Sequence, residues 1–154
     1  MRIISLILVS FFIYNSLSAQ LKRPAPKEKR VDTLRLLCPV PGVMPQSPSV
    51  EKGTGYKGDL KVSFKSVNDT LFLAPVDGKI DLITMGEGGK YEIVMHYYNY
   101  NIWFTGISKL LVKKNDMPKK GQPIGIINPG DEVELLLFDD EEPVDPKKFL
   151  DCKK

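Results

Sequence analysis

Prolines and glycines divide this chain into short segments and leave little room for helices. The sequence contains 12 prolines and 12 glycines among 154 residues, and both residue types favour turns and interrupt regular structure. No window of about a dozen residues shows a 3.6-residue hydrophobic period. Short β-rich runs lie between the turn residues, which indicates an all-β sandwich or barrel. We predict strands over residues 59–64, 70–73, 79–84, 90–97, 100–105, 109–112, 123–127 and 132–138.

The first 19 residues have the features of a secretory signal peptide. Arg2 supplies a positive charge, residues 3–14 are apolar apart from two serines, and small residues precede Gln20. The apolar stretch is shorter than the roughly 20 residues needed to cross a bilayer. We therefore predict that residues 1–19 are removed and that the rest of the chain is exported. An uncleaved membrane anchor is the alternative.

The exported part is predicted to be a linker followed by one domain. Residues 20–35 carry six basic residues and two prolines, a composition typical of a flexible or extended linker. Residues 36–154 are enough for a single β-domain. The net charge of +3 is spread without a dominant basic block, so we expect no nucleic-acid partner. The acidic run 139–142 is expected to be a solvated loop.

The two cysteines of the chain, Cys38 and Cys152, stand near the two ends of the predicted domain. An even pair of cysteines in an exported protein usually forms a disulfide. Such a bridge would close a loop of roughly 110 residues and stabilise the fold by about 4–5 kcal/mol in the chain-entropy model. Since no C-x-x-C motif is present, we interpret the pair as a structural link; two unpaired thiols are the alternative.

Three stretches, in this order, resemble the lysostaphin/LytM-type peptidoglycan metallopeptidase domain. They are residues 73–80 (LAPVDGKI), residues 107–125 with ISKLLV and KKGQPIG at their two ends, and residues 143–150 (PVDPKKFL). The resemblance covers about residues 36–150. It implies a LytM-like fold, a two-sheet antiparallel sandwich or barrel-sandwich hybrid, preceded by a flexible N-terminal segment.

The same resemblance implies that the zinc site of the family is missing. Active members bind zinc through H-x-x-x-D and the second histidine of H-x-H, while two further histidines assist the attacking water. The single histidine of this chain, His96, falls at a position that is not a ligand. We therefore expect no peptidase activity and no cofactor. The positions that correspond to the family's site carry Asp59, Ser63, Gly106, Glu132 and Glu134.

Two other groups of residues are candidates for binding. Asp59, Glu132 and Glu134 would suit a hard cation if they converged, but we favour ordinary surface acids. Tyr98, Tyr100 and Trp103 belong to an aromatic-rich hairpin suited to stacking on sugar or anchoring a protein. We expect Trp103 to be a core residue, while exposure of the two tyrosines stays open.

These observations favour a binding function over catalysis. We expect an exported protein, in the periplasm or at the outer membrane, that serves as a scaffold or regulatory subunit for cell-envelope proteins, an outer-membrane complex among the candidates. The first alternative is a peptidoglycan-binding module that uses the groove near Asp59, Gly106 and Glu134. The second, less favoured, is a peptidoglycan hydrolase with an atypical metal site.

Overall fold

The computed structural model describes residues 30–31, 33–47, 60–68 and 70–152. The predicted signal peptide, residues 1–19, lies outside the described residues, as does most of the predicted linker. Within the described part there is no α-helix, and the two 3₁₀ turns are η1 (Glu87–Gly89) and η2 (Pro146–Lys148). The strands are β1 (Leu36–Leu37), β2 (Lys61–Lys65), β3 (Thr70–Leu73), β4 (Lys79–Met85), β5 (Tyr91–Tyr97), β6 (Tyr100–Ile107), β7 (Lys109–Leu110), β8 (Pro123–Ile127), β9 (Glu132–Asp139), β10 (Glu142–Val144) and β11 (Leu150–Asp151).

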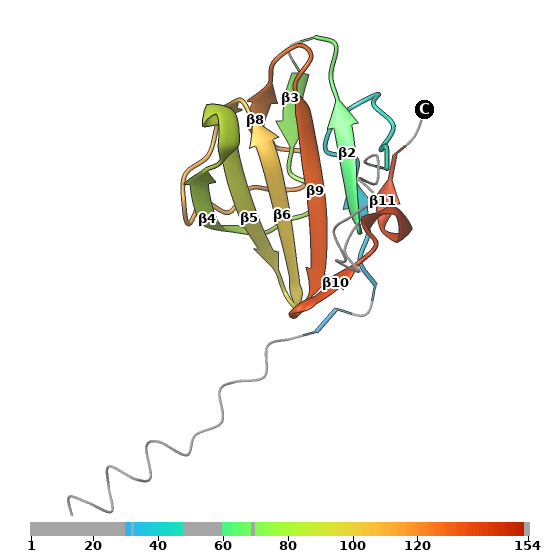
Figure 1. Cartoon of the computed structure of the whole chain (residues 1–154). Helices are drawn as coiled ribbons and strands as arrows, with labels where there is room; N and C mark the ends of the chain where they lie inside the picture. Colours follow the sequence, from blue (N-terminus) through green and yellow to red (C-terminus); the bar gives the residue numbers. More distant parts are fainter. Residues whose placement is uncertain (1–29, 32, 48–59, 69, 153–154) are drawn as a thin grey trace, which may run out of the picture.

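A six-stranded antiparallel sheet forms the larger layer. Its strand order is β10-β9-β6-β5-β4, and β2 also pairs with β9 (Figure 1). Two strands pair with the same edge of the long strand β9: β2 pairs with its first part, and β10 pairs with its last residues. On its other edge β9 pairs with β6. Strand β9 therefore holds the β2 and β10 regions to the hairpin formed by β5 and β6.

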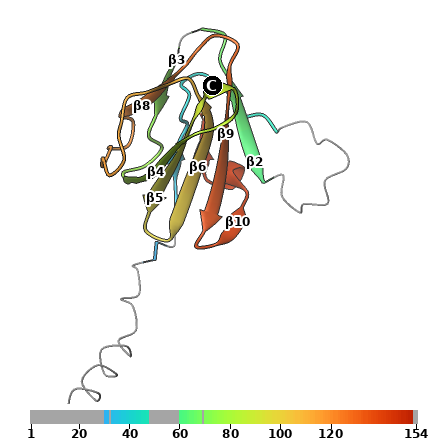
Figure 2. The ribbon, with the colours of Figure 1, turned by 60° about the vertical axis from the view of Figure 1, so that its left-hand side comes forward.

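A second sheet, in the order β3-β8-β7, packs behind the first (Figures 1 and 2). The two layers meet through alternating apolar side chains, as expected for strands with one buried face. Phe72 of β3 and Phe104 of β6 make an edge-to-face contact with ring centroids 5.0 Å apart. Both rings are fully buried. The predicted all-β two-sheet fold is thus confirmed.

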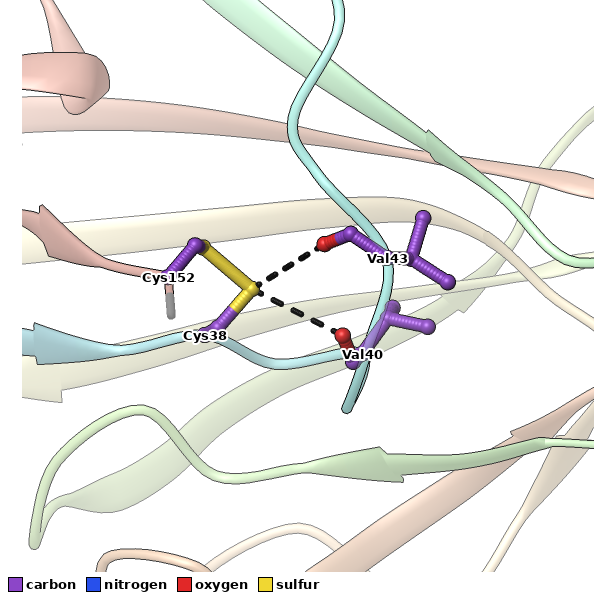
Figure 3. Close-up of a disulfide and its surroundings, with 4 residues drawn as sticks. All are labelled: Cys38, Val40, Val43 and Cys152. Carbon is purple, nitrogen blue, oxygen red and sulfur yellow. Dashed lines mark hydrogen bonds between the residues drawn. A yellow bond between two sulfur atoms is a disulfide. The ribbon is translucent and has the colours of Figure 1, made fainter. Parts of the chain in front are cut away.

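The two ends of the domain are joined by a short parallel sheet and a covalent bond. Strand β1 pairs in parallel with β11, with Leu36 opposite Leu150. Immediately beyond this pairing, Cys38 and Cys152 form a disulfide with their Cα atoms 4.8 Å apart (Figure 3). The carbonyl oxygens of Val40 and Val43 lie 3.6 and 3.4 Å from the Cys38 sulfur. The predicted disulfide is confirmed.

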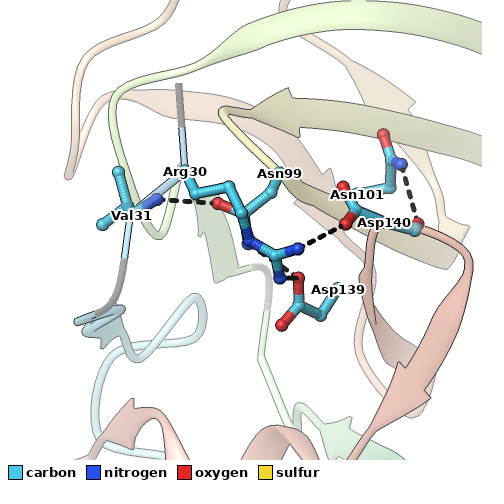
Figure 4. Close-up of polar contacts among 6 residues, drawn as sticks. All are labelled: Arg30, Val31, Asn99, Asn101, Asp139 and Asp140. Atoms are coloured by element: carbon cyan, nitrogen blue, oxygen red, sulfur yellow. Dashed lines mark hydrogen bonds and ion pairs between the residues drawn. The ribbon is translucent and has the colours of Figure 1, made fainter. Parts of the chain in front are cut away.

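The last residues of the segment predicted as a linker contact the domain. The Arg30 guanidinium donates hydrogen bonds to Asp139 and Asp140 at 2.9 and 3.0 Å (Figure 4). The backbone N–H of residue 31 donates to the Asn99 side-chain oxygen at 2.9 Å. Leu34 is buried in the core. Domain contacts therefore begin before residue 36, and part of the acidic run 139–142 binds this segment.

Candidate functional site

Three neighbouring strands bring together most of the residues that correspond to the family's zinc site. Ser63 of β2 lies opposite Glu134 of β9, and Thr105 of β6 lies opposite Glu134 from the other side. Gly106 follows Thr105, and Glu132 precedes Glu134 by two residues on the same strand face. Asp59 lies outside the described residues. Ser63, Gly106, Glu132 and Glu134 therefore lie on neighbouring strands, and their correspondence to the zinc site stays a prediction.

Ser63 is covered in this cluster. Only 2% of the residue is exposed to solvent. Its backbone forms an antiparallel bridge with Gln46, with N···O distances of 2.9 and 2.8 Å. The segment at Gln46 thus pairs with β2 on the edge opposite β9. Ser63 consequently has little surface with which to contact a ligand.

Gly106 has a backbone conformation that leaves no room for a side chain. Its φ angle is +89°, in the left-handed region that L-amino acids rarely adopt. A Cβ atom placed there would lie 2.2 Å from the carbonyl oxygen of Glu132. This distance is far below a van der Waals contact, and the atom it meets belongs to the backbone. A histidine cannot occupy this position without moving β6 or β9.

Glu134 is paired with a lysine. Its carboxylate accepts a hydrogen bond from Lys61 Nζ at 2.7 Å, and each side chain is about one-third exposed. The two residues project from adjacent strands. Glu134 also borders a pocket of about 370 Å³, which we call the Gly106 pocket. Its lining consists of Gly86, Glu87, Lys90, Glu92, Thr105, Gly106 and Glu134.

A hydrogen-bonded cluster fixes one wall of the Gly106 pocket. The Asp131 carboxylate accepts a hydrogen bond from Ser108 Oγ at 2.7 Å and also pairs with Lys90 Nζ. The bond from Lys90, and then that from Ser108, lowers the pKa of Asp131 below its usual value. The N–H of Asn128 donates to Ser108 Oγ at 3.0 Å. This cluster ties the start of β5 to the segments before β9 and after β6.

Solved structures share the architecture of this domain. Csd3 of Helicobacter pylori is similar with a TM-score of 0.65 and 20% sequence identity, over 82% of this chain and 36% of Csd3. Lysostaphin of Staphylococcus simulans is similar with a TM-score of 0.58 and 21% identity, over 70% of this chain and 49% of that chain. The domain has the lysostaphin/LytM-type fold.

A third similar structure comes from a complex of two proteins. A chain of the SpoIIQ–SpoIIIAH pore-forming complex matches with a TM-score of 0.60 and 15% identity, over 78% of this LytM-type chain and 93% of that chain. No protein-family model and no curated protein matches the sequence. The chain spans only 36% and 38% of the Csd3 chains from two crystal forms.

The residues present do not fit the zinc of the LytM-type peptidases. Zinc sites of this kind need imidazole and carboxylate donors around one open position. Here Ser63 is buried, Gly106 has no side chain, and Glu134 is paired with Lys61. Among residues 30–31, 33–47, 60–68 and 70–152, no group of three or more His, Cys, Asp or Glu side chains is arranged to hold a metal ion. The hard-cation site considered for Asp59, Glu132 and Glu134 would require a residue outside this part.

The three aromatic candidates of the LytM-type domain occupy different environments. Tyr100 is 5% exposed, and its ring lies 6.1 Å from that of Phe149. Trp103 is 37% exposed, contrary to the expected core position. It alternates with the buried Ile102 and Phe104 and so projects from the outer face of the large sheet. Tyr98, also 37% exposed, is in the turn between β5 and β6.

A second pocket lies beside that turn, and sequence reasoning missed it. We call it the Tyr98 pocket; its volume is about 270 Å³. Three segments line it, namely residues 77–79, 96–98 and 117–119. No local sequence pattern signals this pocket, because the three segments are brought together only by folding. No helix in the described part of the chain has the length and apolar character needed to cross a membrane.

Proposed function

We propose that the chain is a catalytically inactive, exported LytM-type protein that binds a partner protein of the cell envelope as a scaffold or regulatory subunit. The conformation of Gly106 is the observation that carries the proposal. In the family pattern this position holds a histidine that assists catalysis. Here the Glu132 carbonyl oxygen occupies the space a side chain would need. Activity could not return by a single substitution.

The charges of the remaining residues also support a loss of catalysis. Lys61 neutralises Glu134 at the position of a zinc-binding histidine, with a contact of 2.7 Å. A cation beside a metal position opposes binding of Zn²⁺ by charge repulsion. Ser63, at the position of the metal-binding aspartate, is buried. The domain has the LytM-type fold, but the residues at the zinc positions differ from those of the family. This combination favours a role in binding.

Participation in a protein complex has a structural precedent. A chain in the SpoIIQ–SpoIIIAH pore-forming complex has a similar fold. Features of the sequence support a location outside the cytoplasm, because residues 1–19 resemble a signal peptide. The Cys38–Cys152 disulfide agrees with an oxidising compartment. We place the protein in the periplasm or at the outer membrane.

Two measurements test this proposal. The purified protein, supplied with Zn²⁺, is incubated with peptidoglycan, and soluble fragments are analysed by mass spectrometry; we expect none above a blank. The tagged protein, expressed at its native level, is then purified from detergent-solubilised envelopes, and we expect a stoichiometric protein partner. Peptidoglycan cleavage that Glu134→Ala abolishes would refute the proposed loss of catalysis.

Co-sedimentation with peptidoglycan separates the proposal from the binding-module alternative. The purified protein is mixed with insoluble peptidoglycan at low salt and centrifuged. We expect it to stay in the supernatant. If it sediments with the polymer, and if affinity purification recovers it alone, the protein is a peptidoglycan-binding module instead.

A further inference from the structure

The Tyr98 pocket lies at the opposite end of β5 from the Gly106 pocket. Glu92, near the start of β5, borders the Gly106 pocket, while His96 and Tyr97 at its end border the Tyr98 pocket. Among the described residues, none of Ser63, Gly106, Glu132 and Glu134 lines the Tyr98 pocket. Any ligand bound there would therefore be independent of the site that defines the peptidases of this fold.

Apolar groups form the walls of the Tyr98 pocket. The rings of Tyr97 and Tyr98 meet edge to face with centroids 4.7 Å apart. Met117 and Pro118 contribute the facing wall, and 72% of Met117 is exposed. Burial, followed by the proximity of Tyr98 and Asp77, raises the pKa of Tyr97. An exposed methionine next to aromatic rings is a surface that adapts well to an inserted apolar group.

Tyr98 adopts a backbone conformation that is unusual for its residue type. Its φ angle is +52°, in the left-handed region. Asparagine and glycine are the residues favoured at such positions in two-residue hairpin turns. Bulky residues are rare there, and strained conformations of this kind cluster at ligand-binding sites. The strained backbone holds the Tyr98 ring at the edge of the pocket.

A glycine allows the floor of the pocket to be tightly packed. A Cβ atom on Gly78 would lie 2.8 Å from the carbonyl oxygen of His96 and 3.1 Å from the Met95 side chain. Asp77, the preceding residue, accepts hydrogen bonds from the Lys120 N–H at 2.8 Å and from Lys119 Nζ at 3.3 Å. The turn before β4 is thereby fastened to the loop that carries Met117.

Basic groups outnumber acidic groups around the opening. Lys79 lies opposite His96 across the β4–β5 pair, and Lys119 approaches from the third segment. Asp77 is the one carboxylate among the lining residues. Lys79 and Lys119 form ion pairs with Asp81 and Asp77. Since these pairs are solvent-exposed, they are weak and exchange readily with another carboxylate.

We propose that the Tyr98 pocket binds one aromatic side chain that a partner protein presents next to an acidic residue. The aromatic ring would contact Tyr98 and Met117, and the neighbouring carboxylate would contact Lys79 or Lys119. The inference rests on the proposed function, because it locates the surface through which a partner docks. Buried aromatic anchors of this kind supply much of the affinity at protein interfaces.

The size of the pocket favours a single side chain over a cofactor. Its volume of about 270 Å³ is just under the range of roughly 300–1,000 Å³ typical of small-molecule and cofactor sites. One indole or phenol ring fits within that space. The rest of the partner would then lie on the surface around the opening.

The first test uses a blocked tripeptide as the probe. N-acetyl-Asp-Trp-Asp-amide is titrated into the purified protein carrying ¹³C-labelled methionine methyl groups, and the methyl signals are followed by NMR. We expect a saturable shift of the Met117 signal with a dissociation constant of about 1 mM or tighter. Met85, a 66% exposed methionine of β4 that does not line the pocket, is the internal control. Its signal should not move.

Two further peptides separate the aromatic and acidic contributions. Replacement of the tryptophan by alanine should abolish the shift, and replacement of both aspartates by lysine should weaken binding by about threefold or more. No saturable shift with the original peptide overturns the inference. A shift given by a soluble peptidoglycan disaccharide instead of the peptide also overturns it, because the pocket would then be a sugar site.

Variants of the protein connect the pocket to binding. Tyr98→Asn keeps a residue that tolerates positive φ but removes the ring, and Lys119→Glu reverses a charge. Each should weaken the tripeptide by about tenfold while thermal stability stays near that of the wild type. Met85→Ser is the matched control and should bind normally. Unchanged affinity in both pocket variants overturns the inference.

The same variants distinguish failure of this inference from failure of the proposed function. Each tagged protein is purified from solubilised envelopes. We expect the wild type and Met85→Ser to retain a stoichiometric partner and Tyr98→Asn to lose it. If Tyr98→Asn retains the partner, the pocket is not the docking site, although the proposed function stands. If the wild type has no partner, the proposed function fails, and the tripeptide titration still decides whether the pocket binds.

Discussion

The pockets at the two ends of strand β5 differ in their lining and in how they compare with the site of a LytM-type peptidase. At the Gly106 pocket the backbone of β6 approaches β9 so closely that a side chain at residue 106 is excluded. Charged residues there are paired, as in Lys61–Glu134 and Lys90–Asp131. At the Tyr98 pocket an aromatic ring and an exposed methionine surround open apolar space. One end lacks the zinc-ligand pattern of the LytM-type peptidases, while the other is the end for which we propose docking.

The difference at Gly106 lies in the main chain as well as in the side chain. Replacement of a catalytic histidine by another residue leaves the position available for reversal. At Gly106 the conformation itself has changed, since φ is +89° and the Glu132 oxygen fills the side-chain space. The proposed binding function therefore requires the fold but not a side chain at residue 106.

The largest effect is expected for a Cβ atom at the Gly106 end. Gly106→Ala should lower the free energy of unfolding by about 3–5 kcal/mol, because the added atom meets the Glu132 carbonyl and β6 must separate from β9. Gly130→Ala is the control, because Gly130 has a φ of +81° with nothing within 4 Å of the added atom. It should cost about 1 kcal/mol. Urea denaturation measures both. If both substitutions lower the free energy of unfolding equally, the Glu132 carbonyl oxygen does not exclude a side chain at residue 106.

A smaller effect is expected for the same change at the Tyr98 end. Gly78→Ala should cost about 1–3 kcal/mol, since the Met95 side chain can move whereas the His96 carbonyl oxygen at 2.8 Å cannot. The variant should also weaken the tripeptide, because the floor of the pocket shifts. Calorimetry and the NMR titration measure the two effects. If Gly78→Ala lowers the free energy of unfolding as much as Gly106→Ala, the two ends of β5 tolerate an added Cβ atom equally poorly.

The ion pair at Glu134 should contribute modestly to stability. Lys61→Ala is expected to lower the free energy of unfolding by about 1 kcal/mol, as both side chains are partly solvated. Lys65→Ala, an exposed lysine on the same strand, is the matched control and should be nearly neutral. A double-mutant cycle with Glu134→Ala isolates the coupling energy. A coupling of zero would mean that Lys61 does not hold the carboxylate.

The smallest effects are expected in the pH dependence, with one carboxylate at each end. Hydrogen bonds from Lys90 and Ser108 lower the pKa of Asp131, and those from Lys120 N–H and Lys119 lower the pKa of Asp77. A carboxyl group whose pKa is lowered in the folded state stabilises the protein at pH values above its usual pKa of 3.8. This stabilisation is lost as the pH falls through the pKa of the folded state.

The Asn variants of both residues test this pH dependence. Asp131→Asn and Asp77→Asn should each be less stable than the wild type at pH 7. The difference should shrink as pH falls below 3.8, the usual pKa of both carboxyls. Urea midpoints measured over a pH series provide the check. A difference independent of pH would contradict the assigned hydrogen bonds.

The sequence predicted the longer strands because their signals are local. Turn residues and alternation located β3 and β8 at their observed bounds. Strands β1 and β11 were missed because each has two residues and its pairing partner lies at the other end of the domain. No local pattern encodes such a pairing. The cysteine pair did predict that the two ends of the domain are joined, because that prediction depends only on residue identity and on an oxidising compartment.

Single side chains were harder to place than strands. Trp103 was expected in the core because tryptophan is usually buried, yet its neighbours Ile102 and Phe104 already occupy the inward positions of β6. Strict alternation would have placed it outside. Gly106 was named as a candidate from the sequence, but its exclusion of a side chain depends on the distance between two strands. The Tyr98 pocket depends likewise on three separate segments.

The pairing of β1 with β11 also makes closure of the domain depend on residues from both of its ends. Cys38 and its partner are separated by 114 positions, so a chain emerging from its N-terminus presents one thiol long before the other exists. Without β11, β1 lacks its parallel partner strand, and the Cys38 thiol can attack other disulfides. Closure of the domain therefore needs both of its ends, and a chain truncated before Cys152 would leave Cys38 without its disulfide partner.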